Sequence, residues 1–161
     1  MTTSSVKRTV SFSRRATLEW NGDVVHGSGH VTAGSQAFSI PATFPRVAGD
    51  PPGPTTPEEL LAASHATCFG IGLRSVLAQR GGSANRVQVT ATVTAEKGQG
   101  LIRIQAAHVE CVIEGLSGID SHLLDEIGRA TEEACTISAV LRASVPVTVS
   151  VRAASEADVG R

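Results

Sequence analysis

The first apolar positions of the chain alternate with polar ones, as they do in strands. Ala16, Leu18 and Trp20 alternate with Thr17 and Glu19, which predicts a half-buried strand. Asn-Gly-Asp follows at 21–23 and is typical of a tight turn. We expect an antiparallel meander that then breaks at a loop rich in proline and glycine; its other strands are predicted over about 24–31 and 37–44, and the loop over 46–54.

A long apolar segment after this loop has the signals of a helix. Thr56 can cap it, Pro57 suits its first turn, and Glu59 completes a capping box. The predicted helix runs to about Arg80 and ends at a Gly-Gly pair. No charged residue lies between Glu59 and Arg74, so we expect this helix to be buried on nearly all sides.

The second half of the chain alternates again. We predict a strand over 87–94, a return strand over 101–114 and a final strand over 145–151. Asp120 or Ser121 is expected to cap a second helix, which continues or restarts after Cys135.

This order of elements predicts an α+β fold with mostly antiparallel pairing. We expect one domain over residues 1–161, with a core from about 16 to 151. A single three-stranded sheet cannot cover every face of the apolar helix. We therefore expect a second copy of the chain to cover the rest, in an intertwined homodimer.

Composition narrows the classes of function. A net charge of −1 and an aromatic content of 3% argue against nucleic-acid binding. The apolar runs look too short for a bilayer, and the first 15 residues lack the apolar segment of a signal peptide. We expect a cytoplasmic protein, in which stable disulfides are rare. The three cysteines form no CxxC pair, and no glycine-rich nucleotide motif is present, so we expect neither a metal nor a cofactor.

Cys68, inside the apolar helix, is either a small core residue or a nucleophile. A nucleophilic cysteine must be a thiolate. Cys68 lies too far along the helix for the N-terminal dipole to help, and burial would raise its pKa. An active Cys68 therefore requires a cation from elsewhere in the fold. His65 lies three residues earlier on the same side and could polarise the thiol, but we interpret it and the other histidines as ordinary polar residues.

The segment TTPEELLAASHATCFG at 55–70 resembles the OsmC/Ohr family, named for osmotically inducible protein C and organic hydroperoxide resistance. Thr56 replaces the asparagine of the family's Thr-Asn-Pro-Glu segment, whereas Pro57, Glu58 and Cys68 fit it. A second landmark, a Cys-Pro-Val-Ser-type segment, is matched by Cys135 in CTIS. The early segment EWNGD is similar to the OsmC branch.

The resemblance implies antiparallel sheets wrapped around central helices of a homodimer. It also implies a thiol peroxidase that reduces organic hydroperoxides, and sometimes hydrogen peroxide, and is recycled by a small dithiol, often a lipoyl group. In this interpretation Cys68 attacks the peroxide and Cys135 then forms a disulfide with it. On the residues alone Cys111 competes for that second role, although its strand neighbours Val109 and Ile113 suggest a core position.

The resemblance further implies an arginine beside the reactive thiol, held by Glu58. Ten helical residues span about 15 Å, so Glu58 and Cys68 of one continuous helix cannot meet. We therefore expect Glu58 to come from the other subunit. Alternatively, Glu58 is an acidic residue that only stabilises the helix, because its charge lies near the positive N-terminal end of the helix dipole.

The identity of that arginine is uncertain from the sequence. The family's arginine directly precedes the residue that matches Phe44, where this chain has Thr43. Arg46, in the proline-rich loop, is the best substitute, and Arg14 and Arg15 are more remote choices.

Two alternatives stay open. Cys68 near His65 could perform acyl transfer. The chain could also be a non-catalytic OsmC-like dimer that binds a small molecule or senses redox state, which the Thr43 departure favours. For a peroxidase, the apolar and aromatic-poor surroundings favour a compact alkyl hydroperoxide as substrate.

Overall fold

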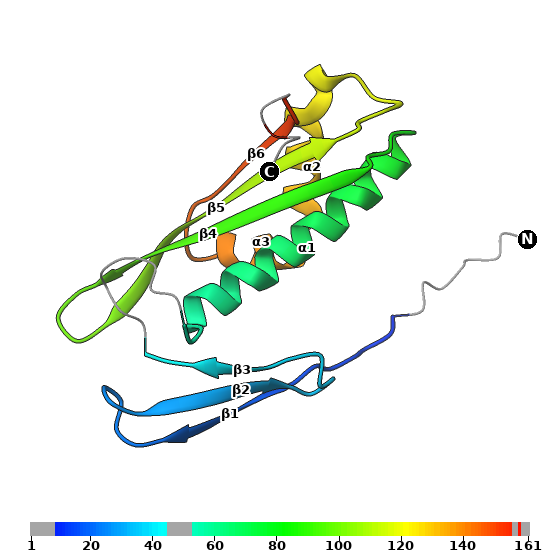
Figure 1. Cartoon of the computed structure of the whole chain (residues 1–161). Helices are drawn as coiled ribbons and strands as arrows, with labels where there is room; N and C mark the ends of the chain where they lie inside the picture. Colours follow the sequence, from blue (N-terminus) through cyan, green and yellow to red (C-terminus); the bar gives the residue numbers. More distant parts are fainter. Residues whose placement is uncertain (1–8, 45–52, 156–157, 159–161) are drawn as a thin grey trace, which may run out of the picture. The chain divides into compact units, whose positions relative to one another are not determined.

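The structure is a computed structural model that describes residues 9–44, 53–155 and 158 (Figure 1). The chain falls into two compact units, Met1–Thr56 and Pro57–Arg161. The prediction of a single domain concerns both units together and stays a prediction.

The first unit is a three-stranded antiparallel sheet in the order β1-β2-β3, formed by β1 (Ala16–Asn21), β2 (Ser28–Ala33) and β3 (Ser39–Ala42). This confirms the predicted meander. The second strand starts later than expected, because the Asp23 carboxylate accepts the N–H groups of Val25 and His26 at 2.8 Å and holds these residues in the turn. The predicted half-burial of the first strand is wrong for the single chain, where Leu18 is 55% exposed.

The second unit holds the larger sheet. Strands β4 (Arg86–Lys97) and β5 (Ile102–Glu114) form an antiparallel hairpin, and β6 (Val147–Ala153) pairs with β5 in parallel. Three of the four pairings among the described strands are antiparallel, which confirms the mostly antiparallel expectation, and the pair of β5 with β6 is the exception. Parallel strands need a long crossover connection, and here the helices between β5 and β6 supply it.

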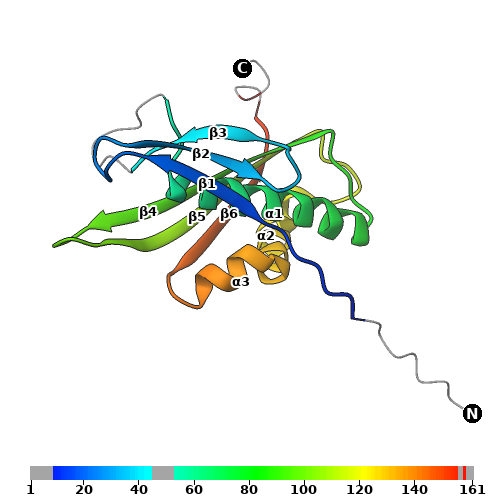
Figure 2. The ribbon, with the colours of Figure 1, turned by 90° about the horizontal axis from the view of Figure 1, so that it is seen from below.

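The helices of this unit pack on one side of its sheet (Figures 1 and 2). They are α1 (Pro57–Gln79), the short 3-10 helix η1 (Ser121–Leu123), α2 (Leu124–Ala134) and α3 (Thr136–Arg142). Asp120 caps η1 by accepting the N–H of His122, so the second helical segment starts where expected. The shared core includes Phe69, Leu73, Leu77, Val109, Ile113 and Ile127.

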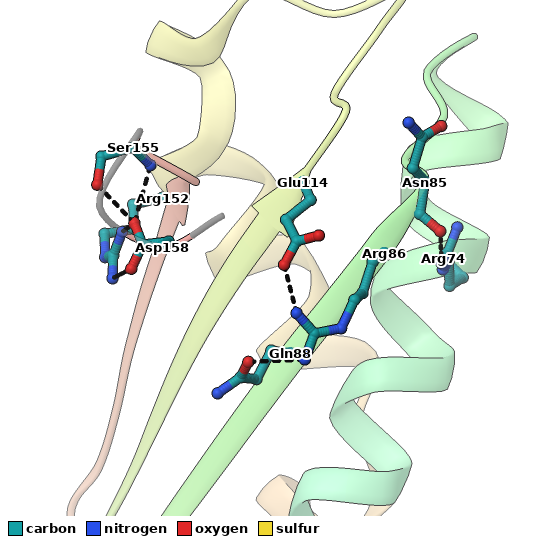
Figure 3. Close-up of polar contacts among 8 residues, drawn as sticks. All are labelled: Arg74, Asn85, Arg86, Gln88, Glu114, Arg152, Ser155 and Asp158. Atoms are coloured by element: carbon teal, nitrogen blue, oxygen red, sulfur yellow. Dashed lines mark hydrogen bonds and ion pairs between the residues drawn. The ribbon is translucent and has the colours of Figure 1, made fainter. Parts of the chain in front are cut away.

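The other face of the larger sheet is polar (Figure 3). Arg86 of β4 forms an ion pair with Glu114 of β5 and donates to Gln88 at 3.0 Å. On the opposite edge strand of this sheet, β6, Arg152 pairs with Asp158 at 2.7 Å. The alternation of valine with polar residues along β4 therefore separates a helix-covered face from a polar one.

α1 buries only one stripe of its surface in the single chain. The buried residues are His65, Phe69, Leu73 and Leu77, spaced four residues apart, whereas Ile71 is 69% exposed. The expectation of burial on nearly all sides is therefore wrong for one chain alone.

The length and hydropathy of α1 also correct an expectation. With a mean hydropathy of 1.3, it is the one helix in the described part of the chain that is long and apolar enough to cross a membrane. Core helices meet the same criteria, and α1 contributes its apolar stripe to the core beside α2 and β4.

Close packing of α2 on β6 gives a test of this arrangement. A Cβ added at Gly128 would lie 2.9 Å from Cγ2 of Val151, whereas one added at Gly72 of α1 would lie 3.6 Å from Cγ2 of Thr131. We expect Gly128→Ala to lower the free energy of unfolding by about 1–3 kcal/mol through overpacking. Gly72→Ala, the matched control, should be neutral or stabilising by up to about 1 kcal/mol, because alanine favours the helix. Urea unfolding of both variants measures this, and equal effects would contradict the packing.

Candidate active site

Cys135 lies at a break between two helices. Its backbone is extended (φ −75°, ψ 117°), so it ends α2 and begins α3. Its Sγ accepts the backbone N–H of Ser138 at 3.5 Å, as an N-cap side chain does. The side chain is buried. The helical pattern therefore restarts after Cys135 rather than continuing through it.

Cys68 lies midway along α1 and is half-buried. Its thiol lies beside that of Cys135, and the backbone N–H groups of Ile137 and Thr136 at the start of α3 lie near enough to stabilise a charge on it. The structure thus brings together the two cysteines that the sequence proposed as a pair, and both are free thiols.

The two thiols differ in how the fold treats their charge. Burial raises the pKa of Cys68, and the adjacent Cys135 raises it further, against the N–H groups of Ile137 and Thr136. Burial also raises the pKa of Cys135, but hydrogen bonds from the side chain and backbone of Ser138, with that of Cys68, outweigh it and lower the pKa overall. The surroundings of the pair therefore stabilise a negative charge on Cys135 better than one on Cys68.

A further cation is consequently still required for a Cys68 thiolate. Among the described residues, none of the groups that shift the pKa of Cys68 is a cation. The proposed arginine, Arg46, lies outside the described residues. Arg14 and Arg15 are exposed in the first unit, where Arg14 stacks on Phe12.

Glu58 lies in the first turn of α1, on the same continuous helix as Cys68. The standard rise therefore keeps the two about 15 Å apart along the helix. One carboxylate oxygen of Glu58, Oε2, is buried and accepts no hydrogen bond within the described part of the chain. A buried carboxylate oxygen without a donor is costly, and an arginine would satisfy it.

A buried polar pair adjoins the two cysteines and was not expected from the sequence. His65 and Ser138 are both fully buried, and Nε2 of His65 lies 2.8 Å from Oγ of Ser138. Burial lowers the pKa of His65, and the negative charge of Glu132 partly opposes this. The contact joins residues far apart in the sequence, so the sequence alone did not predict it. The one available signal was that Ser138 follows Cys135 by three residues, and His65 precedes Cys68 by three.

The third cysteine, Cys111, lies in β5 opposite Val89 and is fully buried in the core. Burial raises its pKa to about 11. The core position suggested by Val109 and Ile113 is confirmed.

His26 and His30 have a four-residue spacing that metal ligands also use. His26, however, pairs with Asp23 in the turn, with 3.2 Å between Nδ1 and Oδ2. No group of three His, Cys, Asp or Glu side chains that could hold a metal occurs among the residues that the structure describes.

A comparison with known protein families shows which family this chain belongs to. A family model described as OsmC-like protein matches residues 49–150, a span that includes both Cys68 and Cys135. The chain belongs to the OsmC-like protein family. The resemblance found in the two cysteine segments is therefore confirmed.

Curated and solved relatives agree with this family. This OsmC-like protein is 27% identical over 141 residues to Peroxiredoxin OsmC of Escherichia coli, covering 84% of this chain and 94% of the relative. An organic hydroperoxide resistance protein of Elizabethkingia anophelis has a TM-score of 0.71 at 18% identity, covering 91% of this chain and 100% of that chain. OhrB of Bacillus subtilis, also an organic hydroperoxide resistance protein, has a TM-score of 0.66 at 23% identity, covering 88% and 98%. These solved structures confirm the predicted α+β OsmC-like fold.

The environment of Cys111 predicts that it is unreactive in the folded OsmC-like protein. With a pKa of about 11, it is almost entirely protonated at neutral and mildly alkaline pH, and the thiolate is the reactive form. Iodoacetamide at mildly alkaline pH should leave Cys111 unmodified in the native protein and modify it in denaturant. Peptide mass spectrometry reads this directly, and alkylation of native Cys111 as fast as the half-buried Cys68 would contradict its assignment to the core.

Proposed function

We propose that this protein is a two-cysteine peroxidase that reduces organic hydroperoxides, and to a lesser extent hydrogen peroxide. The observation that carries the proposal is the proximity of the Cys68 and Cys135 thiols in a member of the OsmC-like family. The relatives named peroxiredoxin and organic hydroperoxide resistance protein support the same class of chemistry.

The reaction proceeds in three balanced steps. The Cys68 thiolate attacks the outer peroxide oxygen, and the O–O bond breaks as Cys68 becomes a sulfenic acid. The departing alkoxide takes up one proton from solvent, which replaces the proton that Cys68 lost on ionising, and leaves as the alcohol. The Cys135 sulfur then attacks the Cys68 sulfur, which forms the disulfide and releases water. An external dithiol, such as a lipoyl group, reduces the disulfide by thiol exchange and returns both thiols. The steps use no cofactor or metal.

The activation of Cys68 requires a cation, and none is among the described groups that shift the pKa of this thiol. In this proposal Arg46 stabilises the thiolate and the leaving oxygen, and Glu58 of the other subunit orients Arg46. The orphaned Oε2 of Glu58 supports a role in holding such a group.

We also propose that the protein is a homodimer that works in the cytoplasm. The apolar surface that one chain leaves exposed on α1 and on β1, including Ile71 and Leu18, supports a second copy as its cover. Three free cysteines fit a reducing compartment.

A second candidate is a non-catalytic OsmC-like dimer that binds a small molecule or senses redox state. The raised pKa of Cys68 is the observation that favours it, because a protonated thiol reacts poorly with peroxide. For acyl transfer, by contrast, the histidine beside the nucleophile should face it, whereas Nε2 of His65 bonds to Ser138.

Thiol counting tests the peroxidase. We expect the reduced protein to lose two thiols rapidly on addition of a slight excess of cumene hydroperoxide. Cys68→Ser should abolish this loss, Cys135→Ser should stop at a sulfenic acid, and the control Cys111→Ser should behave like the parent. No thiol loss in the parent would leave the non-catalytic candidate. Faster turnover of hydrogen peroxide than of cumene hydroperoxide would overturn the alkyl preference.

The dimer is tested by two matched helical positions. Ile71 of α1 and Val140 of α3 are 69% and 67% exposed in one chain. We expect Ile71→Glu to weaken or abolish the dimer in sedimentation velocity, because it places a charge in the proposed interface. Val140→Glu should leave the dimer intact. A monomeric parent protein, or equal behaviour of the two variants, would contradict α1 as the interface.

A further inference from the structure

A continuous polar chain runs from the interior of the second unit to the two thiols. Nε2 of His65 lies 2.8 Å from Oγ of Ser138. The backbone N–H of Ser138 donates to Sγ of Cys135 at 3.5 Å, and the Ser138 side chain and Cys68 are both near enough to Cys135 to influence its charge. The first three members are buried, so within this chain of contacts a proton can move without bulk water.

We propose that Ser138 and His65 relay the proton of Cys135 when this thiol attacks oxidised Cys68. This inference rests on the proposed function and adds to it a path for the proton of the second step. Ser138 touches the reacting sulfur and is the catalytic residue of the pair. His65 acts through Ser138 and is a positioning residue that also takes up the proton.

The transfer balances within the site. Oγ of Ser138 accepts the proton of the Cys135 thiol while its own hydroxyl proton passes to Nε2 of His65. The Cys135 sulfur forms the disulfide bond as the S–O bond of the Cys68 sulfenic acid breaks. The departing hydroxide takes up the proton that His65 returns, and the net products are the disulfide and one water.

The surroundings of His65 suit this use. Its burial favours the neutral ring, which can accept a proton at neutral pH. The negative charge of Glu132 in α2 favours the charged form that the transfer creates, and Arg142 of α3 forms an ion pair with Glu132. Cys68 on α1 and Cys135 complete the titratable groups around the relay.

A purely structural histidine explains the position less well. His65 continues the stripe of Phe69, Leu73 and Leu77, where an apolar side chain would pack without any hydrogen-bonding demand. Its Nδ1 is buried and has no hydrogen-bond partner among the described residues. A buried ring nitrogen without a hydrogen-bond partner lowers stability. Packing alone therefore does not explain a histidine at this position, whereas a role for Nε2 does.

The relay can be tested without peroxide. In a Cys111→Ser background, 5,5′-dithiobis(2-nitrobenzoate) reacts with Cys68 and releases one thionitrobenzoate. Cys135 then attacks the Cys68 sulfur and releases a second, and the absorbance of this second release reports the step that the relay serves. The leaving thiolate needs no proton, so only the deprotonation of Cys135 is probed.

Two variants in that background separate a relay from a structural role. His65→Gln keeps a side chain that can hydrogen-bond to Ser138 but cannot take up a proton, and Ser138→Ala removes the bridge. We expect each to slow the second release on the order of 100-fold at neutral pH. The difference should shrink at alkaline pH, where Cys135 loses its proton to solvent, and the first release should be unchanged.

Other outcomes overturn the relay or the proposed function separately. A His65→Gln variant that matches the background at every pH excludes the relay, and so does equal slowing of both releases with a lowered free energy of unfolding. If cumene hydroperoxide consumes no thiols in the parent but the variants still slow the second release, the peroxidase proposal fails and the relay stands.

Discussion

The proximity of Cys68 and Cys135 depends on a single departure from helical geometry. Because the backbone of Cys135 is extended, α2 ends and α3 begins at this residue, and the first N–H groups of α3 lie near the sulfur of Cys68. A continuous helix would have used those N–H groups internally. The break therefore supplies both the second thiol and the donors that surround the first.

The core of the second unit fixes this geometry from both sides. α1 buries a stripe that begins at His65 and continues through Phe69, Leu73 and Leu77, so the rotation of the helix about its axis is set by packing. α2 is held against β6 at Gly128, where a larger side chain would meet Val151. One thiol thus lies on α1 and the other at the junction of two packed helices, and both are held by packing as a reaction between two side chains requires.

Local sequence patterns predicted most of the helices and strands. They did not predict contacts between residues that lie far apart in the sequence. The start of α1 could be predicted because Thr56, Pro57 and Glu59 act within one turn. The parallel pairing of β6 depends on the path of the whole connection, and the contact of His65 with Ser138 joins residues 73 positions apart. The exposure of Ile71 escaped prediction for a related reason: an all-apolar helix does not reveal which of its sides a single chain covers.

The burial of Cys111 has a consequence for the fidelity of oxidation. Three thiols in one chain can pair in three ways, and any oxidant strong enough to act on one could in principle produce the wrong pair. Cys111 is fully buried in β5, and burial raises its pKa to about 11, so its thiol stays protonated in the folded chain. Because the thiolate is the form that reacts, folding protects Cys111 from oxidation and from pairing, and unfolding removes that protection.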